Sequence, residues 1–336
     1  MQIENLTPNI SVILPVYNGA LYLKESINSI LNQTYTNFEF IILNDGSTDN
    51  SEEIILSYSD KRIKYYKHTN CGLAATLNLG LNLALGTYIA RQDQDDISHK
   101  TRFEKQVDFL ENNLEINLLG TRAKIFENNS SDVRFHKHAT HPADLKFDLL
   151  FNNPFVHSSV MFKKTIIQNI GNYITDRNLY EDYNLWSRIA VNSSVANLSE
   201  VLVDYRHHNE GLSKNISNFK EYALYNQGVE NLKKIFGLHE QHFCDLIALY
   251  HWKKNIFKGS SNKQLKNALD VISQKIIEMY PSHKYLTLLR KKQYLKIIKY
   301  RQIVLKMRAD NITQLKLLYL KIVIKLLGLH SEVKNK

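Results

Sequence analysis

The sequence predicts an α/β fold, in which a doubly wound, mostly parallel sheet is followed by a region made of helices. Two observations carry this prediction. Short apolar runs alternate with stretches of helical periodicity over residues 10–91, and such alternation is typical of parallel strands joined by helices. From about residue 219 the chain changes to long stretches rich in Lys, Leu and Ile, with little Gly or Pro. That change favours helices alone.

Each element of the α/β part follows from a local pattern. Apolar runs that end at turn residues predict strands over residues 10–16, 38–43, 62–67 and 87–91. Apolar residues three and four positions apart predict the helices between them, at residues 23–31, around 54–55, and at 73–85 with Gly86 as C-cap. A loop at residues 210–218 separates an expected domain of residues 1–215 from one of residues 216–336.

Composition limits the class of protein. A chain of 336 residues with 43% hydrophobic residues can bury a core and suggests two domains. Its two cysteines, Cys71 and Cys244, cannot form a disulfide framework, and no CxxC motif or Cys/His cluster indicates structural zinc. We find neither a signal peptide nor an uncharged apolar run of the ~20 residues that a membrane span requires. We therefore expect a cytoplasmic location.

The net charge of +10 is concentrated near the C-terminus. Residues 281–336 hold 14 Lys and Arg against two acidic residues, so residues 1–280 carry a net charge of −2. The stretch 284–329 mixes these lysines with Leu, Ile and Tyr, and residues 315–329 are moderately amphipathic. One interpretation is a helix packed on the N-terminal domain with its lysines solvated. We favour attachment to the inner face of an anionic membrane, where each nearby basic residue adds about 1 kcal/mol.

Three aspartates directly follow the fourth predicted strand. Asp93, Asp95 and Asp96 lie within four residues, and a bound cation would relieve their mutual repulsion. A hard divalent ion such as Mg²⁺ or Mn²⁺ prefers oxygen ligands and leaves positions for phosphate oxygens. The alternative is a solvated acidic turn that caps a helix beginning near Ser98. The metal is favoured because ligands bind beyond the carboxyl ends of parallel strands.

Several other polar side chains can have either a functional or a structural role. Asp45, in a loop of small polar residues, can accept the N3–H of a uracil, or it can form an Asx-turn or cap the next helix. The Glu181–Asp182 pair begins an amphipathic stretch, where a carboxylate can interact with the helix dipole or act as a general base. His207 and His208 follow a predicted strand at 201–205, so at most one of them can face the site. For His157 we favour a structural or acceptor-side role.

Five motifs over residues 10–215 resemble those of family 2 glycosyltransferases. Three resemble the family's nucleotide-sugar motifs: Val12-Ile-Leu-Pro-Val-Tyr-Asn18, Leu43-Asn-Asp-Gly-Ser-Thr-Asp49 and Ala90-Arg-Gln-Asp-Gln-Asp-Asp-Ile97. Two resemble its acceptor-side motifs: Tyr180-Glu-Asp-Tyr-Asn-Leu-Trp186 and Asp204-Tyr-Arg-His-His208. One such motif would be a weak signal, whereas five in order and at ordinary spacing are a strong one.

The resemblance implies a GT-A fold and inverting, metal-dependent transfer of a sugar from a nucleotide diphosphate. Relatives of this kind build bacterial lipopolysaccharide, lipooligosaccharide, capsule or other exopolysaccharide. The resemblance implies that Asp45 holds uracil, that Asp93 lies near the ribose and donor sugar, and that Asp182 is the catalytic base. The remaining implied contacts are the base-lining Pro15, Val16 and Tyr17, the metal ligand Asp95, and His208, which binds metal or diphosphate.

Three positions depart from the family pattern. Leu77 stands where many relatives have Arg, so one diphosphate contact is missing, whereas the following Asn78 matches and is expected to bind the nucleotide sugar. Asn44 replaces a frequent Asp, and Gln94 replaces a small residue between the aspartates. The Gln-x-x-Arg-Trp motif and membrane helices of processive synthases are absent from the sequence. This absence implies transfer of a single sugar.

The implied partners are a UDP-sugar donor, a glycan or lipid-linked oligosaccharide acceptor, and Mn²⁺ or Mg²⁺ as cofactor. A catalytically inactive nucleotide-sugar-binding paralogue is the main alternative. A nucleic-acid-binding protein that uses the basic C-terminal region is a second, but it leaves the acidic loops unexplained, so we expect no nucleic acid. The sequence lacks the glycine-rich motifs of dinucleotide-binding enzymes and P-loop NTPases.

Overall fold

The computed structural model describes residues 8–127, 133–176, 180–208, 222–251, 253 and 255–309. The backbone divides into two compact units, Met1–Ala223 and Leu224–Lys336. The boundary expected between residues 215 and 216 lies outside the described residues.

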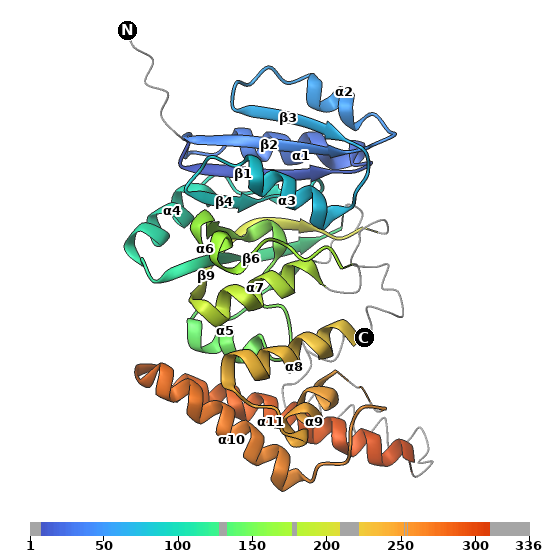
Figure 1. Cartoon of the computed structure of the whole chain (residues 1–336), viewed down its shortest axis with the longest axis vertical. Coiled ribbons are helices and arrows are strands. Elements are labelled where there is room, and N and C mark those ends of the chain that lie inside the picture. The colour runs from blue at the N-terminus through green and yellow to red at the C-terminus, as the bar shows by residue number, and fades with distance from the viewer. Residues whose placement is uncertain are drawn as a thin grey trace. The chain divides into compact units, whose positions relative to one another are not determined.

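The described strands of the first unit form a nine-stranded mixed sheet (Figure 1). Its spatial order is β3-β2-β1-β4-β8-β6-β9-β5, and β7 pairs with β6. Strands β1 to β4 are mutually parallel, β8 is antiparallel to β4 and β6, and β6 is parallel to β9. The strands are β1 (Ile10–Val16), β2 (Phe38–Asp45), β3 (Ile63–His68), β4 (Tyr88–Arg91), β5 (Ile97–Ser98), β6 (Ile116–Phe126), β7 (Arg134–His136), β8 (Met161–Lys163) and β9 (Ser194–Arg206).

Strands β1, β2 and β4 are buried along their whole length, which explains their mostly apolar sequences, whereas the edge strand β3 is partly exposed. Helix α1 packs on one face through Leu23, Ile27 and Ile30. Helix α3 lies against the other face, where a Cβ at Gly80 would meet the Ile13 and Leu43 side chains at 2.6 and 2.9 Å. The helices of this unit are α1 (Ala20–Leu31), α2 (Ser51–Leu56), α3 (Leu73–Leu83), α4 (Arg102–Asn112), α5 (Pro142–Asp148), α6 (Lys164–Ile170) and α7 (Glu181–Asn192), with a 3₁₀ turn, η1, at His157–Ser159.

The four strands and three helices predicted for the N-terminal part are confirmed, with one correction. Helix α3 ends at Leu83, and Gly86 is not its C-cap, because Ala84 already has an extended backbone. Gly86 instead allows close approach to β1, since a Cβ there would lie 2.6 Å from the backbone nitrogen of Ser11. In the second half of the sheet, the strand predicted at residues 201–205 is confirmed as part of β9, whereas the other strands, including β8, were not predicted.

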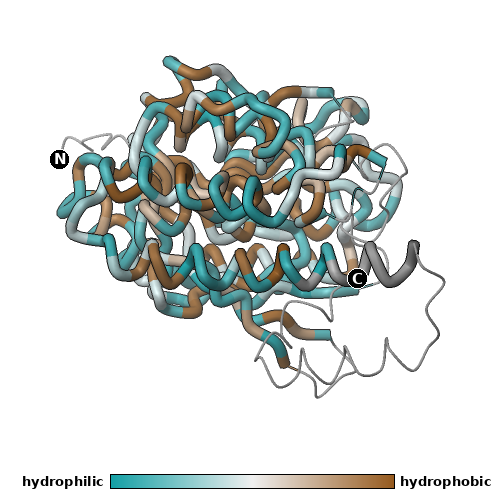
Figure 2. The backbone as a smooth tube through the Cα atoms, turned by 90° about the horizontal axis from the view of Figure 1, so that it is seen from below, coloured by the Kyte–Doolittle hydropathy of each residue, from teal (hydrophilic) through white to brown (hydrophobic). Residues whose placement is uncertain are grey.

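The second unit is helical in its described part. It contains α8 (Ala223–Phe236, of which Ala223 belongs to the first unit), α9 (Gln241–Tyr250), α10 (Asn262–Met279), the 3₁₀ turn η3 (Pro281–His283) and α11 (Lys284–Ala309). Along these helices hydrophobic and hydrophilic residues alternate (Figure 2). The fully buried Asp245 carboxylate accepts the backbone N–H groups of Lys258 and Ser260, and so anchors the loop before α10.

Helix α11 is packed into this second unit. Tyr294, Ile297 and Ile298 are buried, and Lys291 Nζ lies 2.6 Å from an Asp270 oxygen. The first part of the basic tail is therefore a packed helix, but its described partners are helices of the second unit and not the predicted N-terminal domain. Residues 315–329 lie outside the described residues. No helix in the described part of the chain is long and apolar enough to cross a membrane.

Candidate active site

The loops after β1 and β2 are tied to each other at the carboxyl edge of the sheet. Asn18, whose φ is +49°, accepts the Thr48 backbone N–H at 2.8 Å through its side chain. The backbone N–H of Asn18 donates to Ser47 Oγ at 3.1 Å, and that of Gly19 donates to Ser51 Oγ at 2.9 Å. These contacts fix the two loops that precede α1 and α2.

Gln94 joins the loop after β1 to the loop after β4. Its Oε1 accepts the Tyr17 N–H at 2.9 Å, and its Nε2 donates to the Tyr17 carbonyl at 3.1 Å. Gly19 makes room for this contact, since a Cβ there would lie 2.5 Å from Gln94 Oε1. The Gln94 side chain, which the sequence showed only as an unusual large residue, therefore positions Tyr17, whose own side chain is about half exposed.

Asp93 is held as an anion by side chains from two elements. Arg91, at the end of β4, donates Nη2–H to Asp93 Oδ1 at 2.5 Å, and Ser158 of η1 donates its hydroxyl to Oδ2 at 2.6 Å. Burial alone would raise the pKa of Asp93, but the Arg91 charge and these hydrogen bonds outweigh it and hold the pKa below its usual range. Asp93 therefore stays ionised.

Asp95 and His208 meet although they lie far apart in the sequence. His208 Nε2 is 2.7 Å from Asp95 Oδ2, and both side chains are partly exposed. Burial, and then the charge of Asp93, raise the pKa of Asp95, whereas His208 opposes the rise. The neighbouring His207 contacts a different carboxylate, with Nδ1 2.6 Å from Glu127 Oε1.

Asp96 has a structural role. Its carboxylate is fully buried and accepts the Arg206 backbone N–H at 2.8 Å. Burial and the charges of Asp95 and Asp93 raise its pKa well above its usual range. The alternative of an acidic turn that caps a helix near Ser98 is wrong, because Ser98 is in β5 and α4 begins at Arg102.

Asp182 begins the first turn of α7. Asn153 donates Nδ2–H to its Oδ2 at 2.7 Å, and the Tyr183 backbone N–H donates to its Oδ1 at 2.6 Å. Burial, and then the charge of Glu181, raise the pKa of Asp182 to about 7. The charge of Asp93 adds to this rise.

His157 and Asn78 hold the wall next to Asp93. Burial, and then the Arg91 charge, lower the pKa of His157 to about 3, so the neutral ring accepts Arg91 Nε–H at 3.2 Å. The Tyr173 hydroxyl lies 3.2 Å from the same His157 nitrogen. Asn78 exchanges two hydrogen bonds of 2.9 Å with the backbone of Tyr173, so its amide braces this wall.

Asp45 lies at the end of β2, opposite the N-terminus of α3. Its two oxygens accept the backbone N–H groups of Cys71 and Gly72 at 2.7 and 3.0 Å. Its side chain is almost completely buried. The carboxylate is thus fixed by backbone donors.

The sequence and the fold both match known proteins. The family model described as glycosyl transferase family 2 matches residues 11–172. An uncharacterized glycosyltransferase of Haemophilus influenzae is 34% identical over 282 residues, which are 78% of this chain and 84% of the relative. The chain belongs to glycosyltransferase family 2.

Other relatives agree with this assignment. The O-antigen biosynthesis glycosyltransferase WbnJ of Escherichia coli is 37% identical over 256 residues, which are 74% of this chain and 97% of WbnJ. The structure of Staphylococcus aureus TarS residues 1–349 in complex with UDP-GlcNAc matches with a TM-score of 0.61 at 17% identity. That match covers 91% of this chain and 93% of the TarS chain. The predicted GT-A fold is thereby confirmed.

In this glycosyltransferase the structure brings together Asp95 and His208, which the sequence predicts as ligands of a divalent metal. Their ligand atoms are adjacent and partly exposed, while the oxygens of Asp93 are bound by Arg91 and Ser158. A carboxylate oxygen suits Mn²⁺ or Mg²⁺, and imidazole is a common additional ligand.

Sequence reasoning missed several residues of this site. Arg91 stands inside a quoted motif, but no role was assigned to it, to Ser158 or to Asn153. Each acts through a partner at least two strands or helices away, apart from the Arg91–Asp93 pair. The one signal available in the sequence was an arginine at the end of a strand predicted to be buried, next to an acidic motif.

Proposed function

We propose that this glycosyltransferase moves a single sugar, with inversion, from a UDP-sugar to a hydroxyl of a glycan or lipid-linked acceptor. The product would belong to a bacterial surface polysaccharide such as lipopolysaccharide, lipooligosaccharide or capsule. Support for this pathway comes from WbnJ, whose name assigns it to O-antigen biosynthesis and which aligns over 97% of its own length.

The observation that carries the proposal is the protonation behaviour of Asp182. A general base is most effective when its pKa is near the working pH, and the pKa of Asp182 is raised to about 7. In the proposed reaction the Asp182 carboxylate accepts the proton of the acceptor hydroxyl as that oxygen attacks the sugar. The side chain of Asn153 holds the carboxylate in place through Oδ2.

The donor would occupy the edge of the sheet beyond β1 to β4. Pro15, Val16 and the half-exposed Tyr17 would line the base. Each carboxylate oxygen has two lone pairs, so Asp45 can accept a uracil N3–H in addition to its backbone donors. Asp93, an anion held by Arg91, would accept hydroxyl protons of the ribose and donor sugar, and Asn78 would shape the neighbouring wall.

The proposed cofactor is Mn²⁺ or Mg²⁺, held by Asp95 and His208. When bound, such an ion neutralises charge on the diphosphate, which makes UDP a better leaving group. This contribution matters here because Leu77, which is buried in α3, replaces a basic residue found in many relatives.

A donor screen tests the proposal. The purified chain would be incubated with individual UDP-sugars, Mn²⁺ and an acceptor extract, and release of UDP would be measured. We expect one donor to give acceptor-dependent UDP release that EDTA abolishes. Tight binding of a UDP-sugar without turnover on any acceptor would favour the inactive paralogue instead.

We also propose that the protein is cytoplasmic and attaches to the inner face of the cytoplasmic membrane. Helix α11 supports this, because Tyr285, Leu286 and Leu289 are exposed beside exposed lysines. The exposed lysines in the described part of α11 are Lys284, Lys292, Lys296 and Lys299. An apolar and basic surface binds anionic lipid through both burial and charge.

A further inference from the structure

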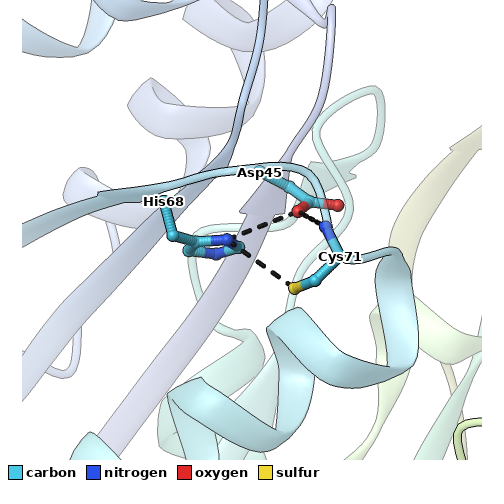
Figure 3. A group of neighbouring side chains, drawn as sticks. All are labelled: Asp45, His68 and Cys71. Atoms are coloured by element: carbon cyan, nitrogen blue, oxygen red, sulfur yellow. Dashed lines mark hydrogen bonds and ion pairs between the residues drawn. The ribbon is translucent and has the colours of Figure 1, made fainter.

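Asp45, His68 and Cys71 form a compact group of metal-ligating side chains beside β2 and β3 (Figure 3). His68 Nδ1 lies 3.4 Å from Asp45 Oδ1 and 3.7 Å from Cys71 Sγ. All three ligand atoms are within 4.8 Å of one another. The group shares no residue with the proposed metal ligands Asp95 and His208.

These separations match the edges of a zinc coordination tetrahedron. Zinc–nitrogen and zinc–oxygen bonds of ~2.1 Å and a zinc–sulfur bond of ~2.3 Å give edges of about 3.4 Å between nitrogen and oxygen. The same bond lengths give about 3.6 Å between nitrogen and sulfur. The two measured separations are therefore already close to those of a bound ion, and rotation of the exposed Cys71 side chain can adjust the third.

The fold builds this group from two neighbouring strands. Asp45 and His68 are register partners at the ends of parallel strands β2 and β3. The following loop returns Cys71 toward Asp45, where a Cβ at Gly46 would lie 2.8 Å from the Asn70 backbone nitrogen. Only glycine, here with φ +72°, allows the two loops to approach so closely.

Neighbouring groups orient the ligands. The Cys71 and Gly72 backbone N–H groups hold the Asp45 carboxylate at 2.7 and 3.0 Å, and Thr76 Oγ1 lies 3.6 Å from Cys71 Sγ. Such outer contacts are characteristic of protein metal sites. Asp45 is buried, His68 is intermediate and Cys71 is exposed, so an ion can enter from the Cys71 side.

We propose that Asp45, His68 and Cys71 form a three-ligand site for a thiophilic divalent cation, with Zn²⁺ as the best fit. One thiolate, one imidazole and one carboxylate are the ligands that select Zn²⁺ over Mg²⁺ or Mn²⁺. Three protein ligands leave a fourth position open, as in zinc sites that exchange water or ligand.

The site has a consequence for donor binding, and this consequence rests on the proposed function. Asp45 is the residue proposed to hold the uracil, and its Oδ1 is also the oxygen nearest His68. A Zn²⁺ ion on this oxygen withdraws negative charge from the Asp45 carboxylate and leaves it a weaker acceptor for the uracil N3–H, so zinc should weaken donor binding and inhibit the enzyme.

Cobalt titration of the full-length, metal-free protein tests the site itself. Co²⁺ replaces Zn²⁺ in such sites and gives a near-ultraviolet sulfur-to-cobalt charge-transfer band only where a thiolate is bound, so ions at Asp95 do not contribute to this band. We expect the wild-type chain to show this band, and Zn²⁺ to remove it. Cys71→Ser should abolish the band, His68→Asn should weaken Co²⁺ binding by at least about 100-fold, and Cys244→Ser should leave both unchanged.

No band at saturating Co²⁺ near neutral pH, or a band that survives Cys71→Ser, would overturn the proposal. Because Cys71 is exposed, its serine variant should keep the circular dichroism spectrum of the wild type. UDP binding measured with and without Zn²⁺ separates this site from the proposed function. If zinc binds through Cys71 but UDP affinity is unaffected, the cation site stands and the uracil contact of Asp45 fails.

Discussion

The loop after β4 and the first turn of α7 each carry a partly buried aspartate of the candidate active site, and the surroundings act on the two carboxylates in opposite ways. Asp93 has the Arg91 guanidinium and the Ser158 hydroxyl beside it, and its pKa is below the usual range. Asp182 has Glu181 beside it and only neutral hydrogen-bond donors on its own oxygens, and burial raises its pKa to about 7.

The difference separates the roles of two identical side chains. A carboxylate that stays ionised throughout the reaction can orient hydroxyl groups, whereas one that titrates near neutral pH can accept a proton. The groups that surround each aspartate, rather than the residue type, therefore determine its proposed role. Asp93 is proposed to position the donor, and Asp182 is proposed to act as the base.

The largest effect is expected from Asp182→Asn, which removes the proposed base. Turnover should fall by about 10²–10⁴-fold, while UDP affinity should stay within about twofold, because the base contacts the acceptor rather than the nucleotide. Steady-state transfer and UDP titration calorimetry measure the two quantities. Loss of UDP affinity together with turnover would show that Asp182 is a structural cap, and Glu181 would be the next candidate for the base.

Asp95→Asn should have the next largest effect, because it removes a charge but keeps the shape of a proposed metal ligand. We expect turnover to fall by about 10²-fold, consistent with the several kcal/mol that metal-ion catalysis supplies. UDP affinity should no longer increase on addition of Mn²⁺. The matched control is Asp204→Asn, whose carboxylate contacts His99 and Lys124 instead. Full activity of the wild type in EDTA would contradict the metal role.

Arg91→Gln tests whether the Arg91 guanidinium is what distinguishes Asp93 from Asp182. Arg91 is fully buried, and removal of one partner of a buried pair typically costs ~3–5 kcal/mol. The cost here should be smaller, because about a quarter of the Asp93 side chain is exposed. We expect about tenfold lower turnover and a lower free energy of unfolding in urea. The double variant with Asp93→Asn should recover part of that stability, and strictly additive losses would contradict the pairing.

Removal of residues 310–336 should have the smallest effect on chemistry, because both aspartates and their partners lie in the first unit. This cut keeps α11, whereas a cut after residue 280 would remove the buried Tyr294, Ile297 and Ile298. Transfer to a soluble acceptor analogue should stay within about twofold. Sedimentation with anionic liposomes should fall only in part, because the exposed apolar and basic surface of α11 remains, and salt should weaken binding of the full-length chain. Equal liposome binding by both chains would show that the removed segment is not the attachment site.

The sequence was most informative where contacts are local. The strands that end at Val16, Asp45 and Arg91 follow from apolar runs of a few residues, and so do the polar loops after them. The antiparallel strand β8 was not predicted, because it has only three residues and is defined by its pairing with β4 and β6.

The site shows the same limit. Spacing alone grouped Asp93, Asp95 and Asp96. It could not show that Arg91 neutralises Asp93 or that His208 contacts Asp95. It also could not show that Asp96 accepts the backbone N–H of Arg206. Nor could it reveal the group around Cys71, because the search for Cys and His along the sequence omits an aspartate contributed by another strand. Such partners depend on sheet register, which connects residues distant along the chain.

The pH dependence of kcat/KM tests the role of Asp182 most directly. Only the ionised carboxylate accepts a proton, so the rate should fall about tenfold for each pH unit below the pKa of Asp182, about 7, and level off above it. Glu181→Gln, which removes the neighbouring negative charge, should move this acid limb to lower pH. A profile that stays flat from pH 8 to pH 5, or a limb that Glu181→Gln does not move, would contradict Asp182 as the base.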